Sequence, residues 1–435
     1  MLRKKLNKLR NVALGVLCLS LAVAQPCFAS APLGYDEYGD PIVTATPVPD
    51  NSTSTGQTTV TAPLHSDYYT QAADTDSIEG WPTGPNVEAQ AAVLMDVNTE
   101  TVLYSKNGDT QLYPASITKI LTTLLACENL GYKTNITVSD TAAYSVSSGD
   151  SSIYASPGET FTRNQALMAV MLQSANEMSV AVAEQVSGSV KKFTELMNWR
   201  ARLFGCKNSH FNNPNGLPDE THYTTASDMA RIAKSAWMNP LFRMFCTTRY
   251  YEIPATSYFK EPRQLLNHHK MMKGGDYYYE GVLGGKTGYT QAAGNTLVTY
   301  AERNGTTLVA VVLNSISAAG AYSDTASLFD YGFNNFQKVD MEVDMDPVPV
   351  RNLPCEKYIL KNCGNTYPFY YKSKVYVTLP TGIDKSVLTK RQAVLHDAVG
   401  PLRLKSKYYY KDHLVGWGMQ YERNIVSDLL LPSPS

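Results

Sequence analysis

Ser116 and Lys119 are the residues whose types and spacing most directly suggest chemistry, because they form an S-x-x-K pattern where an apolar helical pattern begins. Residues three apart on a helix share one face, with Cβ atoms about 5–6 Å apart. The lysine amine can then take the serine proton, provided that burial or a neighbouring cation lowers its pKa and keeps it neutral. Pro114 favours a helix start here, which leaves the N–H of Ser116 as an oxyanion donor. The pattern predicts a serine nucleophile with a lysine base.

Two other patterns suggest the rest of an acyl-transfer site. Ser174 and Asn176 form an S-x-N between two helical patterns, although both residue types are also common helix caps. Lys286 and Gly288 belong to a K-T-G that follows two glycines and opens a strand-like run. Glycines allow a ligand to approach the backbone closely, and a lysine on such an edge suits the anchoring of a carboxylate. The alternative is a lysine on a solvated strand.

Each pattern is weak evidence on its own. S-x-x-K recurs at 189–192 and 257–260, and S-x-N recurs at 105–107, so chance produces such matches in this chain. K-T-G occurs once, where average residue usage predicts about 0.1. The combination is specific, because the three patterns appear in the order used by active-site serine enzymes that recognise penicillin.

On these residues the chain resembles the low-molecular-weight penicillin-binding proteins, which are serine D-alanyl-D-alanine carboxypeptidases. The resemblance covers about residues 90–336 and includes the segments at 113–119, 213–217, 224–228 and 285–290. It implies an α+β fold of the β-lactamase/transpeptidase type, an antiparallel sheet flanked by helices, followed by a small all-β domain. It also implies removal of the terminal D-alanine from peptidoglycan pentapeptide stems and covalent inhibition by β-lactam antibiotics, with no cofactor and no metal.

The resemblance implies a role for each catalytic residue. Ser116 would form the acyl-enzyme, with Lys119 as its general base. Ser174 would relay a proton to the departing D-alanine, and Asn176 would position the substrate and Lys119.

A second group of residues would bind the substrate. Lys286 and Thr287 would hold its terminal carboxylate, and Lys286 would also be the second cation that keeps Lys119 neutral. Gly288 completes the K-T-G, and the N–H of Tyr289, the next residue, would form the oxyanion hole together with that of the nucleophile.

Three alternatives stay open at this point. A D,D-endopeptidase that acts on cross-links would use the same residues. A class A β-lactamase needs a deacylating glutamate in E-x-x-L-N, and the nearest stretch, at 195–198, has the wrong spacing. A non-catalytic wall-binding protein would share the fold, but no proposed reacting group is missing. The sequence departs from the family at 174–178, where the usual S-G-N-D-A is S-A-N-E-M.

The elements that must position these residues are strands at both ends of a helical region. Strands are expected at 91–96 and 101–104, and again at 295–302 and 307–313 around an Asn-Gly turn. Helical patterns lie at 116–130, 164–173, 178–186, 191–204, 226–237 and 322–336. This order suggests that the two ends share one sheet, in a catalytic domain at 88–337.

A strand-rich module is expected at 338–426, followed by a tail at 427–435. Its candidate strands are 348–350, 358–360, 367–371, 375–379 and 402–410. Pro349 restricts the first of these to an edge strand or to no strand. The tail is too short for the amphipathic docking helix that many family members carry, so the sequence does not establish membrane attachment.

The N-terminus has the pattern of a secretory signal peptide at 1–31, with basic residues followed by an apolar run and small residues. The apolar run, 12–24, is shorter than the roughly 20 residues that span a bilayer, so cleavage after Ala29 or Ala31 is expected. Residues 32–87 are rich in Pro, Thr, Ser, Asp and Gly, which indicates a flexible linker with order beginning near residue 90. The protein is therefore expected outside the cytoplasmic membrane, at the cell wall or membrane surface.

Charge, cysteine and histidine content limit the classes of partner, disulfide and metal site that the chain could have. A net charge of −1, with no basic stretch beyond the first ten residues, argues against nucleic acid. Five of the seven cysteines follow the signal, an odd number that excludes a complete disulfide framework, although Cys355 and Cys363 are candidates to pair. No His/Cys cluster has metal-ligand spacing, and His222 is expected to order the loop before Thr224.

Overall fold

The computed structural model describes residues 65–343, 345–349, 366–371, 373–395 and 403–422, all within one compact unit. The signal peptide, most of the linker, the candidate strand at 358–360, the tail, and Cys355 and Cys363 lie outside these residues. Within the described ranges, no helix is both long and apolar enough to cross a membrane.

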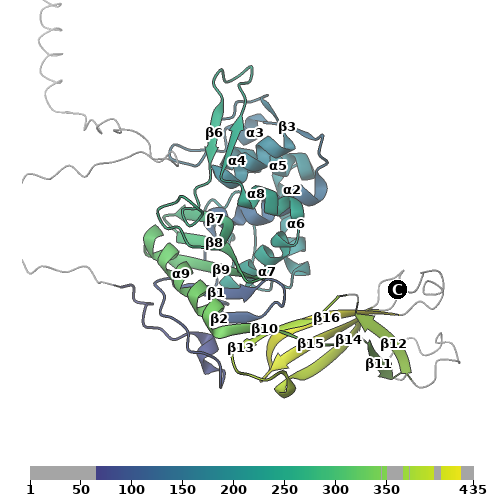
Figure 1. Ribbon diagram of the computed structural model, residues 1–435. Coiled ribbons are helices and arrows are strands. Elements are labelled where there is room, and N and C mark those ends of the chain that lie inside the picture. The colour runs from purple at the N-terminus through teal and green to yellow at the C-terminus, as the bar shows by residue number, and fades with distance from the viewer. Residues whose placement is uncertain (1–64, 344, 350–365, 372, 396–402, 423–435) are drawn as a thin grey trace, which may run out of the picture. The chain divides into compact units, whose positions relative to one another are not determined.

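The catalytic region is built on a five-stranded antiparallel sheet in the order β2-β1-β9-β8-β7 (Figure 1). Its strands are β1 (Ala91–Asp96), β2 (Val102–Lys106), β7 (Val282–Thr290), β8 (Gly294–Arg303) and β9 (Thr306–Ser315). Because β1 pairs with β9, the two ends of the region share one sheet, and this prediction is confirmed. The order leaves β7, which carries the K-T-G, at one edge.

Different helices cover the two faces of this sheet. α9 (Ala318–Asn335) packs on β8 and β9 from one side, and α7 (Ala226–Trp237) packs on β1 and β9 from the other (Figure 1). Alternate residues of β1 belong to the two cores, with Val93 on the α7 side and Leu94 on the α9 side. Burial on both faces explains why β1 is apolar from Ala91 to Met95 and does not alternate.

The other helices share the core on the α7 side. Sequence signals fix several of their starts. α4 begins with a capping box between Thr162 and Gln165, and α8 begins after Asn239, whose side chain accepts from two backbone N–H groups. The helices are α2 (Lys119–Asn129), α3 (Asp140–Ala143), α4 (Arg163–Leu172), α5 (Asn176–Ser187), α6 (Val190–Leu203) and α8 (Pro240–Thr247).

Four short strands, the single-turn helix α3 and α8 were not predicted. The strands are three or four residues long, which is too short for a periodic pattern to be recognised. Asn239 and Pro240, the N-cap and the first residue of α8, were a usable start signal that the periodicity pattern does not include. The strands form two hairpins, β3 (Asn135–Thr137) with β4 (Thr160–Thr162), and β5 (Tyr250–Ile253) with β6 (Arg263–Leu266).

The segment at 65–89 is ordered, which corrects the expectation of a flexible linker up to residue 87. Trp81 is buried, and its indole N–H donates to the carbonyl of Leu103 at 2.8 Å. The amine of Lys106, on a fully buried side chain, donates to the carbonyl of Val87 at 2.8 Å. Trp81 and Val87 stand singly among polar residues and prolines, so their burial leaves no periodic hydrophobic pattern in the sequence.

A second sheet forms the C-terminal module in the order β10-β13-β16-β12-β11, with β15 paired to β16 and β14 paired to β15. β11, which carries Pro349, lies at an edge as predicted, because proline cannot donate within a central ladder. β10, β14 and β16 were not predicted; β14 is largely polar, and β16 contains two glycines. The strands are β10 (Phe336–Asp340), β11 (Met345–Pro349), β12 (Thr366–Tyr371), β13 (Tyr376–Pro380), β14 (Thr389–Leu395), β15 (Arg403–Tyr410) and β16 (His413–Glu422).

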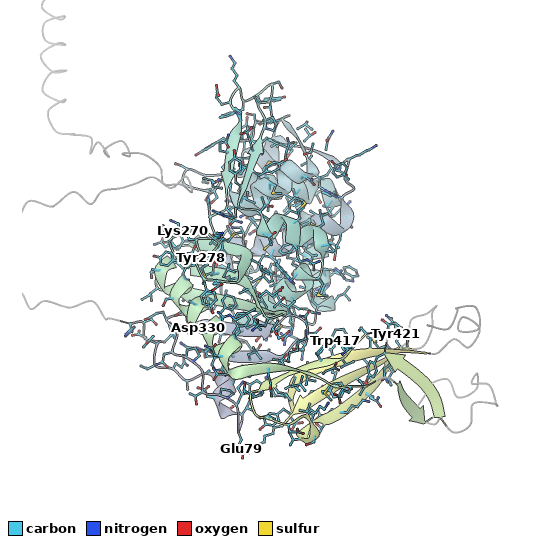
Figure 2. All side chains as sticks on the ribbon, viewed as in Figure 1. Glu79, Lys270, Tyr278, Asp330, Trp417 and Tyr421 are labelled. Carbon is cyan, nitrogen blue, oxygen red and sulfur yellow. The ribbon has the colours of Figure 1, made fainter. Side chains whose placement is uncertain are left out.

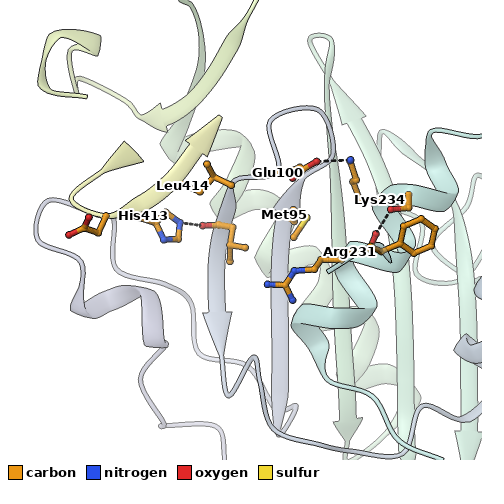
Figure 3. Close-up of a pocket in the computed structure, with 10 residues that line it drawn as sticks. Met95, Glu100, Arg231, Lys234, His413 and Leu414 are labelled. Carbon is orange, nitrogen blue, oxygen red and sulfur yellow. Dashed lines mark hydrogen bonds and ion pairs between the residues drawn. The ribbon is translucent and has the colours of Figure 1, made fainter. Parts of the chain in front are cut away.

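A pocket of about 260 Å³ lies where this module meets the catalytic region (Figure 3). On one side of it, the ring of His413 contacts the carbonyl of Val102 at 2.7 Å. On another, Lys234 pairs with Glu100 at 2.6 Å. None of the residues predicted to do chemistry lines this pocket, so the candidate active site lies elsewhere.

Candidate active site

Ser116 lies in a 3-10 turn, Ala115–Thr118, that leads directly into α2. This corrects the expectation that the α-helix begins at residue 116. With three residues per turn, side chains at i and i+3 are eclipsed. Accordingly, Nζ of Lys119 lies 2.9 Å from Oγ of Ser116. The turn brings the predicted nucleophile and the predicted base within hydrogen-bond distance.

The backbone at this turn is strained and tightly enclosed. Ala115 is buried and has a φ of 50°, a left-handed conformation that costs a non-glycine residue about 1–3 kcal/mol. A Cβ on Gly216 would lie 1.9 Å from the carbonyl oxygen of Ala115, and a Cβ on Gly288 would lie 2.9 Å from the nitrogen of Ser116. Glycine at both positions is therefore what lets a loop and strand β7 close on the backbone of the nucleophile.

The amine of Lys119 is oriented by two groups besides Ser116. The side chain is fully buried, and Nζ lies 2.7 Å from Oδ1 of Asn176 and 2.6 Å from the carbonyl oxygen of Asn215. A neutral amine has two N–H groups and one lone pair, and both of these oxygens only accept hydrogen bonds. When the amine is neutral, its N–H groups are therefore occupied and its lone pair faces the hydroxyl of Ser116. A general base for that hydroxyl requires this arrangement.

The pKa of Lys119 lies well below its usual value. Burial is the largest cause, because it removes water from the charged form, and the positive charge of Lys286 acts in the same direction. The negative charges of Glu177 and Asp150 act in the opposite direction. The balance favours the neutral amine that proton transfer from a serine requires.

Ser174 lies in the turn between α4 and α5, as the sequence predicted, and Asn176 is the first residue of α5. Ser174 is buried with a φ of 58°, a second left-handed non-glycine residue at the site. Within the described part of the chain, its hydroxyl oxygen has no hydrogen-bond partner. Leaving a buried polar group unpaired costs about 1–3 kcal/mol. This hydroxyl is therefore available to a group that enters the site.

The K-T-G residues lie on edge strand β7 beside the nucleophile. Lys286 is buried, which lowers its pKa to about 7, and its amine donates to the carbonyl of Thr287 at 2.8 Å. Its charge influences the pKa of Lys119, so the two amines share one region of low dielectric. Gly288 borders the nitrogen of the nucleophile, and the side chain of Tyr289 is exposed.

His222 orders the neighbouring loop, as predicted, and does so through both ring nitrogens. Its ring is fully buried, and Nδ1 accepts from the backbone N–H of Asn212 at 3.0 Å. Nε2 must then carry the proton, which it donates to Oγ1 of Thr118 at 2.9 Å. Burial lowers the pKa of His222 to about 4, so the ring stays neutral near pH 7. The histidine thus ties the loop to the turn that carries the nucleophile.

Glu177 is a site residue that the sequence did not single out by its chemistry. Its side chain is buried, and Oε1 accepts from Oγ of Ser152 and from the N–H of Ile153, both at 2.8 Å. The N–H of Asn176 donates to the carbonyl of Ser151 at 2.9 Å. These bonds hold the segment at 151–155 against the start of α5. The only signal was the departure from the family pattern at this position.

Comparison with known proteins agrees with this geometry. A family model described as D-alanyl-D-alanine carboxypeptidase, peptidase S11, matches residues 79–317. The D-alanyl-D-alanine carboxypeptidase DacF of Bacillus subtilis is 33% identical over 321 residues, which cover 73% of this chain and 77% of DacF. A D-alanyl-D-alanine carboxypeptidase of Streptomyces sp. strain K15 is 31% identical over 58% of this chain and 89% of its own length.

Solved structures share the fold. Penicillin-binding protein 5 from Haemophilus influenzae, 24% identical, superposes with a TM-score of 0.62 over 79% of this chain and 99% of that chain. The Streptomyces K15 DD-transpeptidase, 29% identical, superposes with a TM-score of 0.55 over 58% of this chain and 100% of that chain. Because the family model matches more than half of the 435 residues, the chain belongs to peptidase family S11, the D-alanyl-D-alanine carboxypeptidases.

Proposed function

We propose that the protein removes the terminal D-alanine from peptidoglycan pentapeptide stems through an acyl-enzyme on Ser116. Family membership supports the reaction class. The observation that carries the mechanism is the amine of Lys119, which lies 2.9 Å from Oγ of Ser116 while two acceptors occupy its N–H groups.

Acylation begins when Oγ of Ser116 attacks the carbonyl carbon of the penultimate D-alanine and its proton passes to Nζ of Lys119. The N–H groups of Ser116 and Tyr289 stabilise the oxyanion that forms. The C–N bond then breaks, and the departing D-alanine takes a proton relayed by the hydroxyl of Ser174. Asn176 holds Lys119 in position throughout. Water then attacks the ester, gives its proton to the lysine and releases the shortened peptide.

The terminal carboxylate of the substrate is assigned to Lys286 and Thr287. With a pKa of about 7, the amine of Lys286 is partly neutral in the free enzyme. An arriving carboxylate favours its charged form, so substrate binding and a charged Lys286 reinforce each other. That charge in turn opposes protonation of Lys119, which supports the base during acylation.

The proposed location follows from the sequence pattern at the N-terminus and from the substrate. Cleavage of the signal after Ala29 or Ala31 would release the catalytic domain at 88–337 and the module at 338–426 outside the cytoplasmic membrane. N-terminal sequencing of the exported protein tests the cleavage site. The family acts on D-alanyl-D-alanine substrates, which supports a location at the cell wall.

The reaction is tested by incubating the protein with a soluble pentapeptide that ends in D-Ala-D-Ala. We expect stoichiometric release of free D-alanine and of the tetrapeptide, with no release by a Ser116→Ala variant. A cross-linked muropeptide dimer serves as the competing substrate. Cleavage of the dimer without release of D-alanine from the pentapeptide would identify an endopeptidase instead. A fluorescent penicillin that labels the Ser116→Ala variant would overturn the assignment of the nucleophile.

Two conservative substitutions at Glu177 should separate its charge from its mechanical role. Glu177→Gln removes a negative charge that raises the pKa of Lys119. The pH range over which the acylation rate rises, as Lys119 loses its proton, should therefore move to lower pH. Glu177→Asp keeps the charge but draws it away from Ile153, so the rate should fall about tenfold or more without that shift. Penicillin acylation rates across pH measure both effects. If the acylation rate of Glu177→Gln rises over the same pH range as that of the wild type, the electrostatic role of Glu177 is contradicted.

A further inference from the structure

The segment at 147–155 borders the active site on the side of α5. Asn176, whose side chain orients the amine of Lys119, donates its backbone N–H to the carbonyl of Ser151 at 2.9 Å. Consecutive Cα atoms lie about 3.8 Å apart, so Asp150 is one residue away from this contact with the catalytic residues. The side chain of Asp150 is half-buried, which leaves its carboxylate accessible from the site.

The carboxylate of Asp150 belongs to no ion pair within the described part of the chain. Its Oδ2 accepts from the backbone N–H of Ser147 at 2.8 Å. A turn of this kind needs only an acceptor, which asparagine or serine would also supply. The negative charge raises the pKa of Lys119 and so acts against the base. Neither the turn nor the proton transfer therefore explains why a charge is present here.

Other carboxylates of the catalytic region illustrate the difference. Glu177 also raises the pKa of Lys119, but its side chain is buried and accepts hydrogen bonds from residues of the same segment. In the loop that leads into β7, Asp276 lies 3.4 Å from the amine of Lys270. Asp330, on α9, accepts from a tyrosine hydroxyl of that loop at 2.7 Å; Figure 2 labels Lys270 and Asp330. These acidic residues already have partners within the protein.

The orientation assigned to the substrate brings part of the peptide toward this segment. Its terminal carboxylate is assigned to Lys286, so the peptide that precedes the cleaved bond extends from Ser116 away from that amine. Asn176 is assigned to position the substrate, and its backbone is bonded to the residue that follows Asp150. An ammonium group at the end of a flexible side chain, like that of lysine, suits a half-buried carboxylate at this place.

We propose that Asp150 selects substrates that carry a positively charged amine on the side chain of the residue before the two D-alanines. The proposal rests on the carboxypeptidase reaction proposed above and names the class of peptide that the site favours. The carboxylate is held in place, because hydrogen bonds to Asn176 and Glu177 fix the residues that follow it. A fixed partner lowers the ordering cost of binding. The bound ammonium also offsets the negative charge that acts on Lys119.

The test compares two tripeptides as substrates of the full exported chain. Nα-acetyl-L-lysyl-D-alanyl-D-alanine keeps its side-chain amine, and the Nα,Nε-diacetyl form lacks that charge. The selectivity is the ratio of kcat/KM for the charged peptide to kcat/KM for the acetylated one, measured as release of D-alanine. We expect Asp150→Asn, which keeps the acceptor for Ser147, to lower this ratio about three- to tenfold. Asp109→Asn removes an exposed carboxylate elsewhere and should keep the wild-type ratio.

Two further measurements separate charge from structure. Asp150→Glu keeps the charge and should retain most of the selectivity. Added salt should lower the ratio of the wild type but not that of Asp150→Asn, because salt screens a charge pair. A ratio that is the same in the wild type and Asp150→Asn, or that Asp109→Asn lowers equally, would overturn the inference. Failure of the wild type to release D-alanine from either peptide would instead overturn the carboxypeptidase reaction.

Discussion

Lys119→Ala is expected to lower kcat/KM for a pentapeptide ending in D-Ala-D-Ala by about 10²–10⁴-fold, the range typical for loss of a general base. The amine is the group within hydrogen-bond distance of the Ser116 hydroxyl, and its burial and the charge of Lys286 keep it neutral. Penicillin acylation should slow by a comparable factor, because the same proton must leave the same hydroxyl.

The pH profile provides the more specific test of this base. Only the neutral amine accepts a proton, so the wild-type rate should rise as pH rises through the pKa of Lys119. Because that pKa is depressed in the folded protein, this rising limb of the rate profile should lie at a pH well below the usual lysine pKa of about 10.4. Lys119→Ala should lose this limb. A limb that persists in the variant would show that another group takes the proton.

The second S-x-x-K of the chain supplies a matched control. Ser189 is the N-cap of α6, where its hydroxyl accepts from the N–H of Lys192, and the side chain of Lys192 is exposed. Lys192→Ala should therefore leave both acylation and turnover unchanged. A similar loss of rate in this variant would point to a general effect of lysine removal.

The contrast between these two pairs shows what the sequence could predict. Both have the same spacing, and the sequence distinguished Ser116 through Pro114, through partners at Ser174 and Lys286, and through the family-like residues around it. The structure supplies the physical difference, since one lysine is fully buried and the other is exposed. Periodicity likewise predicted the sheet and the long helices, because amphipathic elements repeat their burial pattern in the sequence.

The unpredicted features depend on contacts between distant segments. Asn215 orients Lys119 through a backbone carbonyl, which any residue type could supply. Glu177 acts through the backbone of Ile153, and Trp81 is a single anchor within a polar segment. The 3-10 turn at Ser116 depends on Gly216, which lies about a hundred residues away in the sequence. None of these contacts leaves a local periodic pattern.

Gly216→Ala is expected to reduce penicillin acylation by about 10²-fold or more, although Gly216 carries no reacting group. Its φ is 89°, and an added Cβ would lie 1.9 Å from the carbonyl oxygen and 2.4 Å from the carbonyl carbon of Ala115. Neither atom can yield without moving the strained turn that positions Ser116. The same shift would separate the Lys119 amine from the carbonyl of Asn215, which lies next to Gly216 in the chain.

Gly305→Ala separates this steric clash from the strain of a positive φ. Gly305 has a φ of 74° in the turn between β8 and β9, and an added Cβ there would meet nothing within 4 Å. That variant should lose about 1–2 kcal/mol of stability in urea unfolding and keep wild-type acylation. If Gly216→Ala does not fold, Gly288→Ala tests the same enclosure from the other side, because its Cβ would lie 2.9 Å from the nitrogen of Ser116. Acylation by a folded Gly216→Ala protein within about threefold of the wild-type rate would contradict the requirement for close packing, since a 1 Å displacement at a reacting group costs about 10²-fold.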